Sequence, residues 1–301
     1  MTDEQIEQVR RFSRTVTRRV GALDEGFLAH GRSLAQSRVL WELGRAELDL
    51  RGLRARLDLD SGYLTRILQG LTSDGLVAVR PSELDGRVRS ARLTRSGRRE
   101  WSELDRHSDA AAAAILEPLD ATQRAKLVDA MAEVERLLTS SLVRLEPCDP
   151  SHPHAQASLD AYFAELDARF EGGFDRRLGA PDDPAELVPP AGLVLVATLD
   201  GKPVGCGVVR VHRHGDGTIE YAELKRIWIS PAVRGLGLGR RMLRELERGA
   251  ADAGARVVRL DTNRVLHEAI AMYRSAGYRE IPAFTAHPYA HHWFEKAVDP
   301  P

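Results

Sequence analysis

Lysine, cysteine and long apolar runs are all scarce in this sequence, and the last two exclude whole classes of protein. Cys148 and Cys206 are the only cysteines, and they lack the spacing of a metal site or a disulfide framework, so we expect two reduced thiols. No apolar run approaches the roughly 18 residues of a membrane span, and the charged N-terminus has no signal-peptide core. We therefore expect a cytoplasmic protein with no membrane partner.

Positive charge is almost all guanidinium, because only four of the 43 lysine and arginine residues are lysine. The formal net charge of −1 averages over two halves that differ. Between Arg51 and Arg99 stand eleven arginines and no lysine, against five acidic residues. This local excess of positive charge indicates an anionic partner for that region.

The two ends of the first half are predicted to be helical. Apolar residues recur every three or four positions within residues 1–30, with charged residues between them. A second helical region covers residues 107–145, where Pro118 divides it and Asp120 is a candidate N-cap for the second part. Between these regions, strand-like segments 75–81 and 89–95 flank an Asp-Gly turn, which predicts a hairpin.

A short helix precedes this hairpin, with Asp60 or Ser61 as its N-cap and Gly75 at its end. Its inward stripe is Leu64, Ile67, Leu68 and Leu71. The opposite face and the hairpin carry side chains that could reach phosphates and base edges, with guanidinium suited to a minor groove. An arginine-rich solvated surface is the alternative. The candidate DNA-binding residues are Ser61, Tyr63, Thr65, Arg66, Gln69, Arg87 and Arg89.

Residues 1–145 resemble the MarR family of winged helix-turn-helix regulators. The resemblance depends on the segments "SGYLTRILQGLTSDGLV", "SELDGRVRSARLT" and "LTRSGRREW". It implies a mainly α winged-helix domain that forms a homodimer through its N- and C-terminal helices. It also implies binding to double-stranded operator DNA, with half-sites about one helical turn apart.

Three prolines in "EPCDPSHPH" interrupt the helical pattern, and the predicted domain boundary lies there, giving domains 1–146 and 147–301. Beyond it, helical and strand-like segments alternate, and Asp200-Gly201 predicts a turn between two of the strands. This pattern predicts an α/β domain with a mixed sheet.

Three glycines at alternate positions, Gly235, Gly237 and Gly239, lie between a strand-like segment and an amphipathic helix. Arg240 stands where a dinucleotide fingerprint needs glycine, and the lysine of a P-loop is absent. Successive backbone N–H groups at a helix start can still hold an anion, with charge added by Arg234 and Arg240. A glycine-rich helix start selected for packing is the alternative.

Residues 150–301 resemble the GNAT acetyltransferases through "ELKRIWISPAVRGLGLGRRMLRELE", "RLDTN" and "AIAMYRSAGY". The resemblance implies acetyl-CoA as cofactor, with its pyrophosphate on the glycine segment and its pantetheine arm along the preceding strand. Many members have asparagine where this chain has Leu266, and Asn263 is the expected substitute. The implied cofactor-binding residues are Ile227, Trp228, Ile229, Arg234, Gly235, Leu236, Gly237, Leu238, Gly239, Arg240, Asn263 and Tyr273.

Acetyl transfer by direct attack needs a base for the amine and an acid for the leaving thiolate. Tyr273 matches the family tyrosine in the acid role, and Glu223, with Glu220 behind it, is the predicted base. Phe170 and Phe174 are expected on the acceptor side. Each has an alternative: aromatic packing for the tyrosine and the phenylalanines, and a solvent-facing strand position for Glu223.

No metal site is expected, because "HEAIA" lacks the second histidine of H-E-x-x-H. The leading hypothesis is a bifunctional DNA-binding transcriptional regulator and acetyl-CoA-dependent N-acetyltransferase, whose acceptor is a small-molecule amine. One alternative is a regulator whose GNAT half senses acetyl-CoA or CoA without turnover. Another is an acetyltransferase whose winged helix only dimerises.

Overall fold

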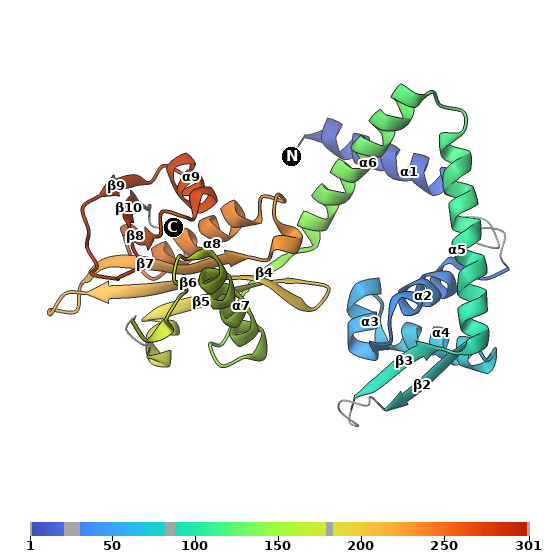
Figure 1. The fold of residues 1–301 in the computed structure, drawn as a ribbon, viewed down its shortest axis with the longest axis horizontal. Helices are drawn as coiled ribbons and strands as arrows, with labels where there is room; N and C mark the ends of the chain where they lie inside the picture. Colours follow the sequence, from blue (N-terminus) through green and yellow to red (C-terminus); the bar gives the residue numbers. More distant parts are fainter. Residues whose placement is uncertain (1, 21–30, 82–87, 179–182, 300–301) are drawn as a thin grey trace. The chain divides into compact units, whose positions relative to one another are not determined.

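The computed structural model describes residues 2–20, 31–81, 88–178 and 183–299 (Figure 1). The chain divides into two compact units, Met1–Met131 and Ala132–Pro301. The boundary expected after residue 146 stays a prediction. Among the described residues, no helix is both long enough and apolar enough to cross a membrane.

The first unit is mainly helical and carries a small antiparallel sheet, in the order expected for a winged helix-turn-helix. The strands lie in the order β1-β3-β2, and β2 and β3 form the predicted hairpin. The elements are α1 (Asp3–Arg19), α2 (Leu34–Arg45), β1 (Leu48–Asp49), α3 (Leu50–Leu57), α4 (Ser61–Ser73), β2 (Val77–Pro81), β3 (Arg89–Leu93), α5 (Arg95–Leu116) and α6 (Ala121–Leu142), the last of which continues into the second unit.

The helices α4 and α6 each begin at an aspartate whose side chain caps the helix. The Asp60 carboxylate accepts a hydrogen bond from the Tyr63 backbone N–H at 2.8 Å, so Asp60 is the N-cap of α4. Asp120 accepts from the backbone N–H of Gln123 at 2.8 Å, as predicted for the start of α6. The inward stripe of α4 is buried as predicted: Leu64, Ile67, Leu68 and Leu71.

Two helices of the chain carry apolar side chains that its own fold leaves exposed. On α1 and at its end, the exposed fractions run from 37% to 63%, and on α6 from 49% to 64%. Helices normally bury such a stripe, so the exposure of these side chains is unusual. The residues concerned are Ile6, Val9, Phe12, Val16 and Val20 in the first segment, and Val128, Met131, Leu137, Leu138 and Leu142 in the second.

The second unit is built on a seven-stranded mixed sheet in the order β4-β5-β6-β7-β8-β10-β9. Among the described strands only β7 and β8 pair in parallel, which confirms the predicted mixed sheet. The elements are β4 (Arg144–Pro147), α7 (Pro153–Arg169), β5 (Gly192–Leu199), β6 (Lys202–Arg213), β7 (Ile219–Ile229), α8 (Leu238–Asp252), β8 (Val257–Thr262), α9 (His267–Ser275), β9 (Arg279–Ile281) and β10 (His292–Ala297).

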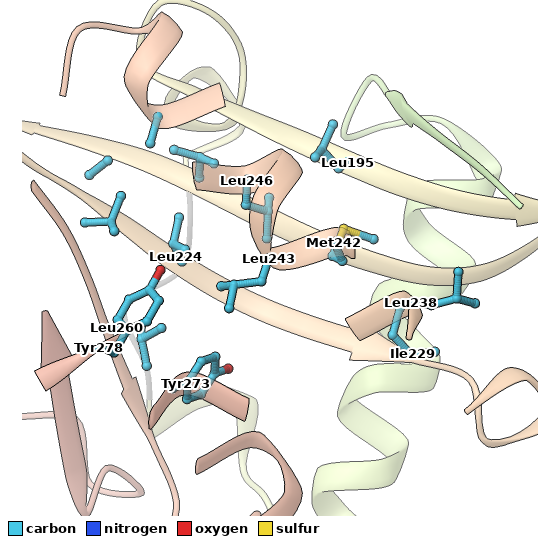
Figure 2. Packing of buried hydrophobic residues seen from close by; sticks show 14 of the residues in the cluster. Leu195, Leu224, Ile229, Leu238, Met242, Leu243, Leu246, Leu260, Tyr273 and Tyr278 are labelled. Carbon is cyan, nitrogen blue, oxygen red and sulfur yellow. The ribbon is translucent and has the colours of Figure 1, made fainter. Parts of the chain in front are cut away.

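Helices cover both faces of this sheet, as the alternation along β5 requires. Leu195 and Ala197 pack in the cluster that contains α8 and α9, whereas Val194 and Val196 pack in the cluster that contains the start of α7. Figure 2 shows the first cluster, with leucines of α8 lying over the strands. The predicted turn between β5 and β6 is confirmed, since Asp200 and Gly201 both have positive φ, of 50° and 72°.

Strand β7 has two irregularities, one in its pairing with β8 and one in its pairing with β6. β7 pairs with β8 only at Ala222 and Glu223, so the two strands part beyond that point. The register between β6 and β7 shifts opposite Arg226, whose φ of 53° is unusual for a residue with a side chain. The second half of β7 therefore has backbone groups on its β8 side that are not paired by any strand of the described residues.

Candidate functional site

The glycine segment forms a tight loop between β7 and α8. Gly235 and Gly237 have φ of 79° and 74°, in the left-handed region that side chains disfavour. The first backbone bond of α8 runs from the Arg241 N–H to the Gly237 carbonyl at 3.1 Å. The N–H groups of Leu238, Gly239 and Arg240 precede that bond and have no helical partner. This helix start can therefore hold an anion.

The loop carbonyls are held by α6. The Arg136 guanidinium donates to the Gly235 carbonyl, and the Ser140 hydroxyl donates to the Leu236 carbonyl at 2.9 Å. Because a trans peptide directs its C=O and N–H to opposite sides, these bonds turn the N–H groups of Leu236 and Gly237 away from α6. The bonds thus fix the orientation of two loop peptides.

Arg234, predicted as a cofactor contact, joins the loop to α7. Its guanidinium donates to the Glu165 carboxylate at 2.7 Å and to the Ile229 carbonyl at 2.9 Å. The Trp228 indole also donates to Glu165, at 2.7 Å. Burial alone would raise the pKa of Glu165, but its hydrogen bonds from Arg234 and Trp228 outweigh it, and the pKa is lowered. Glu165 of α7 thus joins β7 and the glycine loop through its bonds to Trp228 and Arg234, a role that the sequence did not indicate.

A cavity of about 530 Å³ opens where β7 and β8 part. Four of the predicted catalytic and cofactor-binding residues line it: Glu223, Ile227, Asn263 and Tyr273. The glycine loop, Trp228 and Ile229 lie outside its lining. The structure therefore brings the predicted acid and base together at one cavity. The N–H groups that could hold an anion lie outside this cavity, at the start of α8.

Tyr273 lies on α9, buried beneath the sheet and facing this cavity. Its ring packs against Tyr278 and Phe294, with centroids 5.8 and 6.0 Å apart. Burial, followed by the charge of Asp261, raises the pKa of the Tyr273 hydroxyl. The hydroxyl therefore stays protonated at neutral pH and can serve as a proton donor.

Glu223, the predicted base, is 3% exposed and held by two basic side chains. Its carboxylate lies 2.9 Å from His212 Nε2 and 3.4 Å from Lys225 Nζ. Burial alone would raise the pKa of Glu223, but the His212 hydrogen bond and the Lys225 charge outweigh it, so the pKa is lowered. Glu220, expected behind it, is exposed and lies 4.0 Å from His214.

Asp261, at the end of β8, is a cavity residue that sequence reasoning missed. Its carboxylate accepts a hydrogen bond from the Thr285 hydroxyl at 2.9 Å. Burial raises the pKa of Asp261, the Thr285 bond opposes this, and the negative charge of Glu223 raises it further. The cavity thus holds two carboxylates whose surroundings move their pKa values in opposite directions, an arrangement typical of acid–base sites. The sequence pattern that could have indicated Asp261 is an acidic residue just before the end of a strand.

Asn263, the expected substitute for a missing asparagine, already has partners within the chain. Its amide donates to the Tyr289 carbonyl at 2.8 Å, and its side-chain oxygen accepts from the Val265 N–H at 3.0 Å. These bonds fix the loop that carries Tyr289. The cofactor contact at Asn263 stays a prediction, and its observed role is to position this loop.

Aromatic side chains form one wall of the cavity. Phe170 and Phe174, expected on the acceptor side, both line it. Phe174 stacks on Phe163 of α7 with a centroid distance of 5.7 Å and lies 4.8 Å from the Tyr289 ring. The wall is therefore built by α7, the loop after it and the loop that precedes β10.

The predicted DNA-binding residues of α4 share one exposed face. Ser61, Tyr63, Thr65, Arg66 and Gln69 are all exposed, and Arg89 is exposed at the start of β3. The Arg66 guanidinium lies over the Tyr63 ring, 5.7 Å from its centroid. Arg87 lies outside the described residues.

Family comparisons confirm the two resemblances. Residues 30–88 match the MarR family, and residues 156–278 match the Acetyltransferase (GNAT) family. The chain therefore combines a MarR-family region with a GNAT-family region, in that order.

Curated relatives match part of the chain. A stretch of 90 residues, 30% of the chain, is 36% identical to an IAA acetyltransferase of Azospirillum brasilense and covers 56% of it. A stretch of 104 residues, 34% of the chain, is 34% identical to an uncharacterized N-acetyltransferase of Schizosaccharomyces pombe and covers 58% of it. The chain thus spans little more than half the length of these relatives.

Solved structures also match about half of the chain. One described as an acyl-CoA N-acyltransferase from Klebsiella pneumoniae is 26% identical, with a TM-score of 0.41, and the match covers 52% of this chain and 98% of that one. The YusO protein of Bacillus subtilis is 18% identical, with a TM-score of 0.35, over 45% of this chain and 99% of that one.

Proposed function

We propose that the chain is an acyl-CoA-dependent N-acyltransferase joined to a DNA-binding regulator, with acetyl-CoA as donor and a small amine as acceptor. One observation carries the enzymatic half of this proposal. The strands β7 and β8 part beside a helix start whose first N–H groups have no helical partner, and the resulting cavity holds Tyr273, Glu223 and Asp261.

The residues present fit an acyl-CoA. The N–H groups at the start of α8 suit a pyrophosphate, and Gly235 and Gly237 supply a backbone that a bulky ligand can approach. The edge of β7 around Ile227 and Ile229, beyond its pairing with β8, suits the amides of a pantetheine arm. The exposed Arg240 adds positive charge beside the helix start. When bound, the cofactor supplies an acyl group activated as a thioester.

The carboxylate pair serves as the proton acceptor for the attacking amine. An amine must lose its proton as its nitrogen forms the new amide bond to the acyl carbon. Glu223 was the base predicted from the sequence, but its lowered pKa makes it the weaker base of the two. Asp261, with a raised pKa, is the stronger base, and Glu223 keeps negative charge beside it to attract the ammonium form of the acceptor.

Tyr273 serves as the proton donor for the sulfur that leaves as the carbon–sulfur bond breaks. Tyr273 lines the cavity, and burial keeps its hydroxyl protonated. Together, the three groups provide one proton acceptor and one proton donor at one cavity. This is the acid–base requirement of direct acyl transfer.

The first half serves as a homodimeric regulator of double-stranded operator DNA. The exposed α4 face presents Tyr63, Arg66 and Gln69 for the major groove, and the exposed Arg89 adds positive charge at the start of β3. Arg87 stays a candidate from the sequence alone. The exposed apolar stripes of α1 and α6 supply the dimer surface.

A thiol-release screen tests the enzyme proposal. The full-length protein is incubated with acetyl-CoA and a panel of amines that includes amino acids, polyamines and aminoglycosides. We expect CoA release with at least one acceptor, and about a 10²- to 10³-fold loss of kcat in Tyr273→Phe. A folded wild-type protein that binds CoA but acetylates no amine would favour the sensor without turnover.

A salt titration of DNA binding tests the regulator proposal. Arg66→Ala removes a charge from the α4 face, so we expect weaker binding and a shallower slope of log affinity against log salt, by about one for each phosphate that is no longer neutralised. Arg248→Ala, at an exposed position of the second unit, is the matched control. Equal slopes for the two variants would exclude Arg66 from the DNA interface.

A further inference from the structure

The aromatic wall of the cavity combines rings with guanidinium groups. Phe163, Phe170, Phe174 and Tyr289 contact one another in a continuous aromatic cluster, with centroid distances from 4.8 to 5.7 Å. All four line the cavity. Such a wall favours an acceptor with a flat apolar or aromatic group.

Two guanidinium groups stand over the same ring of this wall. Arg176 Cζ lies 3.8 Å and Arg226 Cζ 5.3 Å from the Phe163 centroid, and both residues line the cavity. Arg176 forms an ion pair at 3.2 Å with Asp160, whose side chain is 66% exposed. An exposed pair of this kind is weak, so a ligand carboxylate can replace Asp160 on the Arg176 guanidinium.

The opposite charge lies on β7 and β8. Glu223 and Asp261 face the cavity from these strands, beside Tyr273. A ligand with an amine and a carboxylate therefore finds a partner for each: the carboxylate pair for the amine and Arg176 for the carboxylate. An amine without a carboxylate would make only the first of these two charge-assisted contacts.

We propose that the acceptor is an amino acid with an aromatic or large apolar side chain, acetylated on its α-amine. Arg176 holds the carboxylate, the aromatic wall holds the side chain, and the α-nitrogen faces Asp261. This inference rests on the acyltransferase function proposed above. The step forms the amide C–N bond, breaks the C–S bond, and passes the amine proton to the carboxylate pair while Tyr273 protonates the sulfur.

Matched acceptors test the proposal. Phenylalanine and phenethylamine share the ring and the amine and differ in the carboxylate, whereas glycine keeps the carboxylate and lacks the ring. We expect kcat/KM for phenylalanine to exceed that for either of the other two by about 10- to 100-fold, the worth of one charge-assisted bond or one buried ring. An equal or higher value for phenethylamine overturns the proposal but leaves the acyltransferase function intact. Failure of every amine overturns the acyltransferase function itself.

Adjacent arginines supply the matched variants. Arg176→Gln should lower kcat/KM for phenylalanine about 10-fold or more and leave phenethylamine unchanged. Arg177→Gln makes the same change at a side chain that is 90% exposed and paired with Asp175, outside the cavity lining, and should leave both acceptors unchanged. Equal effects of Arg176→Gln on both acceptors would show that Arg176 does not bind the acceptor carboxylate.

A separate observation concerns α6. Arg136 and Ser140 donate to two successive carbonyls of the glycine loop, and Arg241 of α8 donates to the Val143 carbonyl at 2.8 Å, just after α6. We propose that Arg136 and Ser140 are positioning residues that preset the loop peptides for the cofactor. Both lie outside the lining of the acceptor cavity.

Two neighbouring serines make this second proposal testable. Ser140→Ala removes the bond to the Leu236 carbonyl, whereas Ser141 bonds to the Leu138 carbonyl of its own helix. We expect Ser140→Ala to raise the CoA dissociation constant and the KM for acetyl-CoA about 3- to 10-fold, with kcat and the acceptor KM unchanged. Ser140→Thr should restore binding, and Ser141→Ala should leave it unchanged. The same CoA affinity in Ser140→Ala and Ser141→Ala would overturn the proposal.

Discussion

At the scale of single residues, the two cavity carboxylates show how surroundings separate like groups. Glu223 was predicted from its place in the strand before the glycine segment, but nothing local in the sequence indicated His212 and Lys225 as its partners. Asp261 was missed because its raised pKa depends on burial and on the charge of Glu223, which lies on a different strand. Such tertiary surroundings cannot be read from one strand pattern.

Asp261→Asn and Glu223→Gln should change stability in opposite directions. Asp261 has a raised pKa in the folded state, so its ionised form disfavours folding once the pH exceeds the ordinary aspartate value of about 3.9. Asp261→Asn should therefore raise Tm at pH 7, and the gain should vanish as the pH falls to that ordinary value. Activity should fall by about 10²- to 10³-fold.

Glu223→Gln supplies the contrast. Glu223 has a lowered pKa, so its charge stabilises the fold above the ordinary glutamate value of about 4.3, and that stability is lost as the pH falls through the lowered value. The variant should therefore have a lower Tm at pH 7. Thermal melts of both variants from about pH 3 to about pH 8 check the signs. A loss of Tm in Asp261→Asn at pH 7 would contradict the argument.

At the scale of elements, the glycine loop was predictable in part. Its position between a strand and a helix follows from local periodicity, and the structure adds the positive φ of Gly235 and Gly237. Its carbonyl partners Arg136 and Ser140 lie 99 and 96 residues away, so no local pattern could indicate them. The short strands β4 and β9 were also missed. Each has too few residues to show a strand pattern, and each is stabilised by its pairing with a neighbouring strand, β5 or β10.

Gly237→Ala separates backbone strain from ligand binding. The residue has a φ of 74°, and a side chain there costs about 1 to 2 kcal/mol. We expect a Tm loss together with an increase of about tenfold in the KM for acetyl-CoA.

The matched control is Gly217→Ala. Gly217 has a φ of 85°, open space around it and a place in the β6–β7 connection, outside the cavity lining. It should show a similar loss of Tm and an unchanged KM, as measured by melts and steady-state kinetics. A parallel rise of KM in both variants would mean that the effect at Gly237 does not come from its place in the glycine loop.

At the scale of the whole molecule, α6 begins in the first unit and ends in the second. It carries exposed apolar residues such as Met131 and Leu138 for the proposed dimer, and Arg136 and Ser140 for the glycine loop. A change in the packing of α6 would therefore alter both the proposed dimer surface and the glycine loop. The sequence predicted this helix, but not its hydrogen bonds to the glycine loop.

Acetyl-CoA and operator DNA should therefore influence each other's affinity. If acetyl-CoA changes the affinity for DNA by some factor, DNA must change the affinity for acetyl-CoA by the same factor. We expect a factor of about 5 or more, measured by DNA titration with and without saturating acetyl-CoA and by the reverse experiment. Ser140→Ala should bring the factor closer to one, whereas Ser141→Ala should preserve it. Independent affinities in the wild type would show that the two halves act separately.

The bonds between α6 and the glycine loop also constrain how such a protein can be cut or recombined. An acyltransferase fragment that begins at residue 147 would lack Arg136, Ser140 and most of β4, so its loop would lose two carbonyl partners and its sheet an edge strand. A fragment that begins before Arg136 keeps them all. A winged helix exchanged for another would therefore leave a working enzyme only if the last turns of α6 stay with the catalytic half.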